Sequence, residues 1–321
     1  MPPEMPPEMP PEMPPEMPKD SAGTTPRVVD GDPSTLTLML KAAVPLVPGV
    51  GLVPGLGKPP ADDAVLPEVA LARHDVPVDP SHLRRYAEVC GFPRKDTLPL
   101  TYPHVLAFPL QLAIMTDGAF PFPAIGTVHL ENSITQHRPI QVSETLQITV
   151  RPAALRAHPK GRLFDLVTTV HSRGELVWEE TSTMLRRGAG GAATSTDDER
   201  PHVGPVVVPV GTTQWRLPAD LGRRYAAVSG DRNPIHLYAL TAKAFGFPRQ
   251  IAHGMWTKAR TVAAIENRLP DAVRVDVAFR KPVLLPGTVA FGTEATPEGR
   301  AFALTRPKDG AEHLVGTASA L

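Results

Sequence analysis

The sequence predicts an α+β fold that occurs twice along the chain, and three pairs of similar segments support this prediction. The clearest pair is Arg84–Gly91 and Arg223–Gly230, which are identical at six of eight positions and lie 139 residues apart. The three pairs are 84–91 with 223–230, 134–139 with 277–282, and 161–166 with 299–304. The three segments follow one another in the same order in both parts of the chain, and the two members of each pair are separated by nearly the same number of residues. Because this separation is far longer than the unit of a solenoid, it indicates a duplicated domain.

Each copy has the same predicted order of elements, namely a short helix, a long apolar helix and a run of alternating strands. In the first copy the short helix follows Pro80, the long helix spans 102–115, and strands are expected at 128–135, 145–151 and 162–172. In the second copy the short helix follows Pro218, the long helix spans 253–269, and strands are expected at 273–280, 289–295 and 300–306. A helix followed by strands indicates an antiparallel sheet packed on that helix, which is an α+β arrangement.

The segments outside the two copies have a different composition. Four copies of Met-Pro-Pro-Glu open the chain, a pattern that favours polyproline II and has too few apolar groups for a core. We therefore expect residues 1–62 to be a disordered, proline-rich tail and arm, with one helical turn near 36–41. The first copy is expected at 63–187 and the second at 211–321. A stretch rich in Gly, Ala, Ser and Thr predicts a linker at 188–210.

Composition narrows the class of protein. Lys+Arg and Asp+Glu both number 33, so the formal net charge is zero and we expect neither a nucleic acid nor a membrane surface as partner. The single cysteine, Cys90, excludes an internal disulfide and fits a reducing compartment. The longest apolar stretch, residues 40–56, contains three prolines and is therefore not a spanning helix. With no signal peptide at the start, these features predict a cytoplasmic protein.

The second copy places an acid, an amide and an imidazole within six residues: Asp231, Asn233 and His236. Pro234 lies between them, so we expect extended or turn backbone there rather than a helix. An Asp–His pair suits addition of water to a double bond, because the imidazole takes a proton from water while the carboxylate orients that water and handles the second proton. Asp-x-Asn-Pro is also good turn chemistry, so Asn233 either orients the water or the acid, or only shapes the loop.

The first copy lacks this chemistry. It is about ten residues shorter at the corresponding place and has Phe92–Asp96 there, with no histidine near. The second copy is therefore predicted to carry the catalytic groups and the first copy to lack them. Cys90 and its counterpart Ser229 are expected to be small buried or turn residues, since no nucleophile-elbow pattern surrounds the serine.

Residues 225–242 and 251–255 resemble the hydratase motif of the MaoC-like dehydratases, the (R)-specific enoyl-thioester hydratases of hotdog fold. The matching residues are Tyr225, Ser229, Gly230, Asp231, Asn233, Pro234, Ile235, His236 and Ala242. One departure is Tyr238, which stands where the family often has an acidic residue. The two-copy arrangement resembles the double-hotdog acyl dehydratases, in which a degenerate first half pairs with a catalytic second half.

The resemblance implies a trans-2-enoyl thioester of coenzyme A or acyl carrier protein as substrate. Asp231 and His236 would hold one water and add it to give a (3R)-hydroxyacyl thioester. Gly254, at the start of the second long helix, would donate its N–H to the thioester oxygen. His253 is expected to serve the helix start rather than catalysis. Neither a metal nor another cofactor is expected, an acyl carrier protein is one candidate partner, and both monomer and homodimer fit.

Two alternatives from other classes remain open at this point. A hotdog thioesterase shares the fold and the substrates, but its carboxylate normally lies on or near the long helix, whereas here it lies in the loop ahead of it. A catalytically silent acyl-binding subunit would use the loop only as a structural element. Release of free coenzyme A, or binding without turnover, distinguishes each of these from a hydratase.

Overall fold

The computed structural model of the protein describes residues 25–43, 64–188 and 208–321. Residues 1–24 and 44–62 of the predicted tail and arm, and most of the predicted linker, lie outside the described residues. The described part of the arm contains a short strand and a nine-residue helix, Thr35–Ala43, where the sequence suggested a single helical turn.

The described strands form one sheet of eleven strands. They are β1 (Arg27–Val28), β2 (Leu71–Val76), β3 (Thr127–Gln136), β4 (Leu146–His158), β5 (Gly161–Ser172), β6 (Glu175–Arg187), β7 (Thr213–Leu217), β8 (Val273–Phe279), β9 (Gly287–Thr296), β10 (Gly299–Thr305) and β11 (Glu312–Ala320). Their order across the sheet is β1-β2-β4-β5-β6-β3-β8-β11-β10-β9-β7, and every neighbouring pair is antiparallel except β1 and β2.

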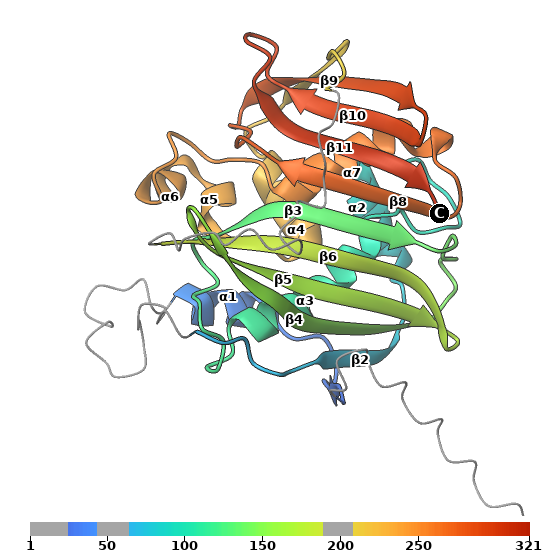
Figure 1. Ribbon diagram of the computed structural model, residues 1–321, viewed down its shortest axis with the longest axis vertical. Coiled ribbons are helices and arrows are strands. Elements are labelled where there is room, and N and C mark those ends of the chain that lie inside the picture. Colours follow the sequence, from blue (N-terminus) through green and yellow to red (C-terminus); the bar gives the residue numbers. More distant parts are fainter. Residues whose placement is uncertain (1–24, 44–63, 189–207) are drawn as a thin grey trace, which may run out of the picture.

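The strand order repeats itself about the middle of the sheet. Outward from the centre, β3, β6, β5, β4 and β2 of the first half correspond to β8, β11, β10, β9 and β7 of the second. The halves join through β3 and β8, which pair from Glu131 opposite Ala278 to Gln136 opposite Val273. This arrangement, visible in Figure 1, confirms the predicted α+β duplication and its double-hotdog form.

The helices gather on one face of the sheet (Figure 1). They are α1 (Thr35–Ala43), α2 (Pro80–Cys90), α3 (Tyr102–Met115), α4 (Leu221–Ser229), α5 (Pro234–Leu237), α6 (Ala239–Ala244) and α7 (Gly254–Ile265), which a turn of 3₁₀ helix, Glu266–Arg268, extends. The long helix α3 packs on β4, β5 and β2, whereas α7 packs on β10. The paired helices α2 and α4 contact each other, so the two halves share one core.

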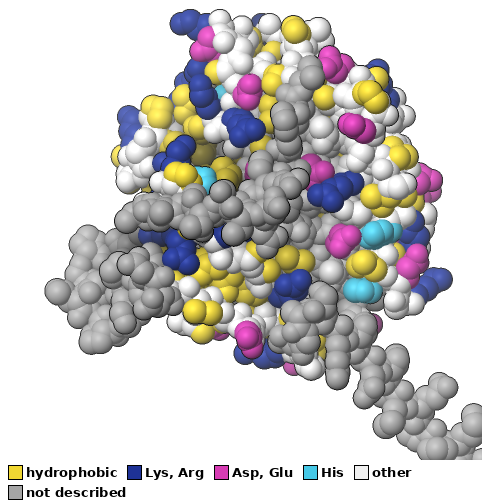
Figure 2. Space-filling model, viewed as in Figure 1, with side chains coloured by type: hydrophobic (Ala, Val, Ile, Leu, Met, Phe, Trp, Pro, Cys, Tyr) yellow, Lys and Arg dark blue, Asp and Glu magenta, His cyan; other side chains and the backbone are white. Residues whose placement is uncertain are grey.

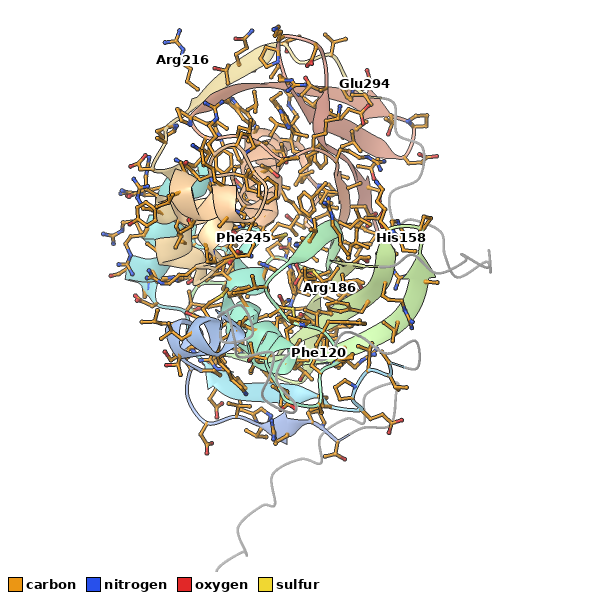
Figure 3. The ribbon with its side chains drawn as sticks, turned by 90° about the vertical axis from the view of Figure 1, so that its left-hand side faces the viewer. Phe120, His158, Arg186, Arg216, Phe245 and Glu294 are labelled. Carbon is orange, nitrogen blue, oxygen red and sulfur yellow. The ribbon has the colours of Figure 1, made fainter. Side chains whose placement is uncertain are left out.

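A single apolar cluster runs through both halves. Its largest buried side chains include Tyr86, Phe164 and Trp178 from the first half and Tyr225 and Phe302 from the second. Burying large aromatic side chains removes much apolar surface from water, which stabilises the contact between the halves. Figure 3 views the molecule from the side of α5 and α6, with Phe245 between the second half, marked by Arg216 and Glu294, and the first half, marked by Phe120.

The sequence found both long helices but missed β2, β6, β7 and β11. The strand β6 shows why, because its inward-facing side chains include the polar residues Glu180 and Ser182. Buried polar residues on the inner face break the alternation of apolar and polar side chains by which a strand is recognised.

No described helix is long and apolar enough to cross a membrane. Figure 2 shows one face of the molecule, on which basic, acidic and apolar side chains are interspersed. The cytoplasmic location expected from the sequence stays a prediction.

Candidate active site

The candidate site is a cavity of about 250 Å³ that both halves line. From the second half, Asp231, Asn233, His236, His253 and Gly254 contribute to its wall. From the first half, the wall includes His104, Phe108, Gln111, Leu112 and Met115, all of α3. The predicted site residues therefore lie on one cavity, and the first half, which the sequence predicts to be chemically silent, forms part of its wall.

The loop that carries the acid is shaped by its own side chains. The helix α4 ends at Gly230, whose left-handed conformation (φ 76°) turns the chain towards the cavity. Next, Asp231 Oδ1 accepts a hydrogen bond from the N–H of Asn233 at 3.0 Å. Asn233 Oδ1 in turn accepts from the N–H of Ile235 at 3.4 Å and caps α5. The loop-shaping role of Asn233 is thus present in the structure, and its role towards a water stays a prediction.

His236 lies on the one-turn helix α5. The sequence predicted non-helical backbone between Asp231 and His236, and this prediction was wrong from Pro234 onwards. The physical reason is the position of the proline. At the first position of a helix a proline lacks only an N–H that would have no helical partner, and its fixed φ suits the helix. The non-helical part is limited to Asp231–Asn233.

A hydrogen bond fixes which nitrogen of His236 carries the proton. Nδ1 lies 2.8 Å from the carbonyl oxygen of Ile251. Because a carbonyl only accepts, Nδ1 must donate, and the lone pair of the neutral ring is on Nε2. Burial lowers the pKa of His236, with Asp231 opposing this effect. The imidazole is therefore neutral at neutral pH, as a general base must be.

His253 holds the acid loop against the start of α7. Its Nε2 donates to the carbonyl oxygen of Asp231 at 3.0 Å and lies 3.8 Å from Asp231 Oδ2. The His253 ring stacks on that of His236 with 3.7 Å between the centroids. Burial, together with His236, lowers the pKa of His253 to about 3. A neutral ring at the cap of α7 fits the helix-start role expected from the sequence.

One carboxylate oxygen of Asp231 and one nitrogen each of His236 and His253 lie within 4.8 Å of one another. A metal would need an unprotonated nitrogen from each imidazole. Nδ1 of His236 and Nε2 of His253 donate hydrogens to backbone carbonyls, which leaves Nε2 of His236 and Nδ1 of His253 unprotonated. The spacing of the group allows a bridging water, and the expected absence of a metal stays a prediction.

Gly254 is the first residue of α7 and lines the cavity. The first N–H groups of a helix have no partner within it, and the helix dipole favours negative charge there. A Cβ atom at this position would lie 3.3 Å from the ring of Phe279, which is a tight contact. The position of Gly254 is compatible with the oxyanion-donor role that the sequence suggested, and that role stays a prediction.

The structure also shows a polar pair that the sequence did not reveal. Nδ1 of His104 lies 2.8 Å from Glu180 Oε1, and both side chains are buried. His129 lies beside them, with its ring 6.5 Å from that of His104. No histidine stands beside Phe92–Asp96 in the sequence, but the fold brings His104 and His129 of the first half to the cavity. His104 and Glu180 are 76 residues apart, so only the pairing of helix and sheet brings them together.

Other predicted residues have structural roles. Cys90 is fully buried, as expected of a small apolar residue. Ser229 Oγ accepts from the N–H of Asp231 at 3.2 Å and so belongs to the turn. Tyr238 is 55% exposed, and the guanidinium of Arg223 lies over its ring at 5.1 Å. The departure from the family pattern at this position therefore affects the surface rather than the cavity.

Comparison with known proteins agrees with the fold. Residues 205–307 match the family model described as MaoC like domain. A 3-hydroxyacyl-thioester dehydratase X of Mycobacterium tuberculosis is 39% identical over 292 residues, covering 90% of this chain and 99% of that protein. A peroxisomal enoyl-CoA hydratase 2 of Arabidopsis thaliana is 28% identical over 208 residues, covering 59% of this chain and 67% of that protein.

Solved structures show the same relationship. A crystal structure of HtdX from Mycobacterium tuberculosis superimposes with a TM-score of 0.69 at 39% identity, covering 78% of this chain and all of that one. A MaoC-like dehydratase from Phytophthora capsici has a TM-score of 0.65 at 21% identity, covering 81% of this chain and 98% of that one, which shows the fold alone. With a relative of this identity aligned over nearly its whole length, the chain belongs to the MaoC-like dehydratase family.

Proposed function

We propose that this protein is a hydro-lyase that reversibly hydrates trans-2-enoyl thioesters to (3R)-hydroxyacyl thioesters. The observation that carries the proposal is the His236–Asp231 pair, in which a buried neutral imidazole has its lone pair on Nε2 and a carboxylate nearby. Both groups line a cavity to whose wall the first half also contributes. The names of the similar proteins, a 3-hydroxyacyl-thioester dehydratase and an enoyl-CoA hydratase, support the same reaction.

The acid–base step follows from the geometry. A water that accepts or donates hydrogen bonds of about 2.8 Å on two sides can bridge groups up to about 5 Å apart. The 4.8 Å limit on the separation of the Asp231 and His236 ligand atoms allows such a water. Nε2 of His236 takes one proton while the water oxygen bonds to C3 of the enoyl chain. The proton then held by the His236–Asp231 pair is delivered to C2, which leaves the protein unchanged.

The electron pair displaced by this attack moves from the double bond to the thioester oxygen. Stabilising that developing charge requires a donor that is already in place. The N–H of Gly254 at the start of α7 supplies it, with the helix dipole acting in the same direction. The absence of a side chain lets the thioester approach the backbone closely. Neither a metal nor an organic cofactor enters this scheme.

The carrier of the acyl group and the assembly belong to the same proposal. Both coenzyme A and acyl carrier protein present the acyl group as the same thioester, so the site as described serves either one. The fold joins two hotdog halves through β3 and β8 within one chain, so a monomer is complete in itself. We therefore propose that activity does not require a second copy, although a homodimer is compatible with it.

The test is hydration of crotonyl-coenzyme A and of a longer trans-2-enoyl-coenzyme A, with chiral analysis of the product. The wild-type protein should form the (3R)-hydroxyacyl thioester, and His236→Ala and Asp231→Asn should lose this activity. Release of free coenzyme A without hydroxyacyl product would instead identify a thioesterase. Binding of both substrates without turnover, also with carrier-protein thioesters, would identify a silent acyl-binding protein.

A further inference from the structure

We propose that the first half binds a hydroxyl group on the acyl chain of the substrate, through His104 and Gln111 on the part of the cavity wall that α3 forms. The inference rests on the proposed function and extends it to the substrate class, which becomes enoyl thioesters with an oxygenated acyl chain. The two residues project from α3 into the cavity that also holds Asp231 and His236.

The polar wall is continuous with the reacting end of the cavity. A Cβ atom at Gly254 would touch the ring of Phe279 at 3.3 Å. The Phe279 ring lies 5.0 Å from that of His129, which in turn lies 6.5 Å from the His104 ring. Gly254, Phe279, His129 and His104 all line the cavity, so an acyl chain whose thioester oxygen is held at Gly254 can extend along them towards His104.

One nitrogen of His104 is already committed. The carboxylate of Glu180 lies 2.8 and 3.0 Å from Nδ1 through its two oxygens. Burial opposes ionisation of this carboxyl, but the interaction with His104 outweighs it and the pKa of Glu180 is lowered. An ionised carboxylate only accepts, so Nδ1 donates to it. The second nitrogen, Nε2, is left for the cavity.

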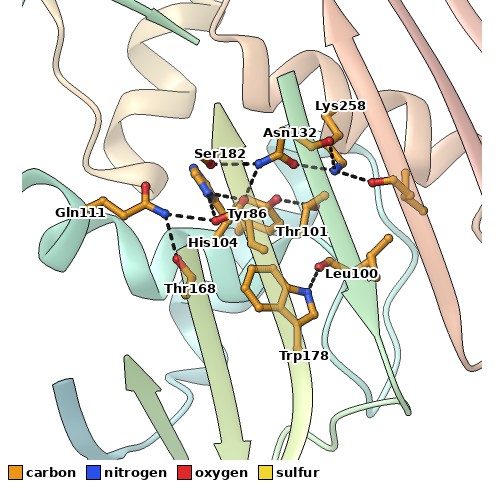
Figure 4. Close-up of polar contacts among 12 residues, drawn as sticks. Tyr86, Leu100, Thr101, His104, Gln111, Asn132, Thr168, Trp178, Ser182 and Lys258 are labelled. Atoms are coloured by element: carbon orange, nitrogen blue, oxygen red, sulfur yellow. Dashed lines mark hydrogen bonds and ion pairs between the residues drawn. The ribbon is translucent and has the colours of Figure 1, made fainter. Parts of the chain in front are cut away.

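Gln111, which lies further along α3 than His104, also has one polar atom bonded within the protein and one left for the cavity. Its Nε2 donates to Glu180 Oε2 at 3.1 Å and to Thr168 Oγ1 at 3.2 Å. Both amide hydrogens are therefore used inside the protein, and Figure 4 shows the amide oxygen directed away from these two partners. Because an amide oxygen only accepts, it requires a donor from the cavity.

Within the described part of the chain, neither Nε2 of His104 nor Oε1 of Gln111 has a hydrogen-bond partner, although the residues are only 6% and 3% exposed. Both residues line the cavity, so an apolar chain that fills it would remove water from these two atoms without replacing its hydrogen bonds, which costs free energy. Because Nδ1 of His104 donates to Glu180, Nε2 of the neutral ring carries the lone pair and accepts, as Oε1 of Gln111 does. A hydroxyl on the acyl chain has one hydrogen to donate, and either of these two atoms can accept it. A keto or ester oxygen has no hydrogen to donate.

A purely structural role does not account for these two atoms. The carboxylate of Glu180 is satisfied by His104, Gln111 and the amide of Asn132. Asn132 is held by the buried ammonium of Lys258, which also donates to the Val275 carbonyl and so joins α7 to β3 and β8 (Figure 4). This network ties the halves together, and it uses neither Nε2 of His104 nor Oε1 of Gln111.

The test compares kcat/KM for a plain trans-2-enoyl-coenzyme A with isomers of the same chain length whose hydroxyl is moved one carbon at a time from C5 towards the chain end. The kcat/KM of one isomer should exceed that of the plain chain by about tenfold, which corresponds to the free energy of about one additional net hydrogen bond. If no isomer exceeds the plain chain, the inference fails while the proposed function stands. If no thioester of the series is hydrated, the proposed function itself fails.

Two variants separate recognition from folding. In His104→Asn the amide nitrogen takes a place close to that of Nδ1 and keeps the bond to Glu180, but Nε2 is gone. This variant should lower kcat/KM for the hydroxyl isomer by about tenfold more than for the plain chain, so that the preference is lost. The control is Phe108→Leu, an apolar change on the same helix, which should retain the preference. Equal losses of activity on both substrates in His104→Asn, or a preference retained there, would overturn the assignment.

Discussion

The two halves of this protein diverge immediately after the same helix. The helices α2 and α4 are copies of one element, and both end on a left-handed glycine, Gly91 (φ 81°) and Gly230 (φ 76°). After Gly91 the chain reaches α3 through a short loop, whereas after Gly230 it first forms the acid loop, α5 and α6. The scaffold is thus the same in both halves, and the added segment of the second half supplies Asp231 and His236.

The helices themselves are adapted to this difference. At the offset that aligns α2 with α4, Leu83 corresponds to Gly222. Leu83 is a buried core residue, whereas a Cβ atom at Gly222 would lie 2.0 Å from the carbonyl oxygen of His236. The glycine therefore gives α5 room to lie directly on α4. The position of the imidazole depends on this close approach as well as on its own loop.

The largest expected effect follows from removing the acid of the second half. Asp231→Asn keeps an oxygen that can accept from the N–H of Asn233, so the turn is retained. It removes the charge that the water and the imidazole require, and kcat should fall by about 10²- to 10⁴-fold, the usual contribution of a general acid or base. The decay of enoyl-thioester absorbance measures it. Full activity in this variant would contradict the assignment of the chemistry to the second half.

The second prediction replaces Gly222 of α4 by leucine, the residue at the corresponding position of α2. In Gly222→Leu the new side chain must displace the backbone of His236, and a displacement of about 1 Å can cost about 10²-fold in rate. The far-ultraviolet circular dichroism should remain that of a folded protein. The matched control is Leu83→Ala, which should cost about 2–5 kcal/mol of stability and leave kcat unchanged. Equal kcat in the two variants would show that α5 tolerates the shift.

These differences also explain what the sequence could and could not predict. Asp231, Asn233 and His236 were found because they lie within one short segment, and α3 was found with its observed limits because its residues form one long apolar run. The pairing of His104 with Glu180 could not be predicted, since it depends on β6 lying beneath α3. The helix α5 was missed because four residues that begin with proline have no helical periodicity.

The arm before the first half offers a smaller effect. Met39 of α1 lines the cavity, and Thr35 lies 3.1 Å from where a Cβ of Gly230 would be. In Met39→Trp the added volume should lower kcat/KM for long enoyl chains by about tenfold relative to crotonyl-coenzyme A, the scale of hydrophobic-pocket discrimination. Leu40→Trp is the control, because Leu40 is 63% exposed on the same helix and should change neither value. The same chain-length profile in both variants would mean that α1 does not bound the acyl site.

The smallest expected effect is on pH dependence. A free imidazole with a pKa of about 6.5 is about three-quarters protonated at pH 6 and would then have lost most of its activity as a base. Burial lowers the pKa of His236, so kcat/KM should fall less between pH 7 and pH 6 than it would with a free imidazole as the base. The acidic limb of the profile of kcat/KM against pH should therefore lie below pH 6.5. An acidic limb at or above pH 6.5 would contradict a buried neutral base.

The same burial has a consequence for stability with a defined sign. His253 has a pKa of about 3 in the folded protein, while an unfolded chain binds its proton near pH 6.5. Between these values the unfolded state holds more protons, so the free energy of unfolding should fall as pH decreases from 6.5 towards 3. Urea denaturation at several pH values measures this slope, and His253→Gln should reduce it. Because His253 holds Asp231 through its backbone carbonyl, the stability of the protein and the position of its acid should decline together in acid.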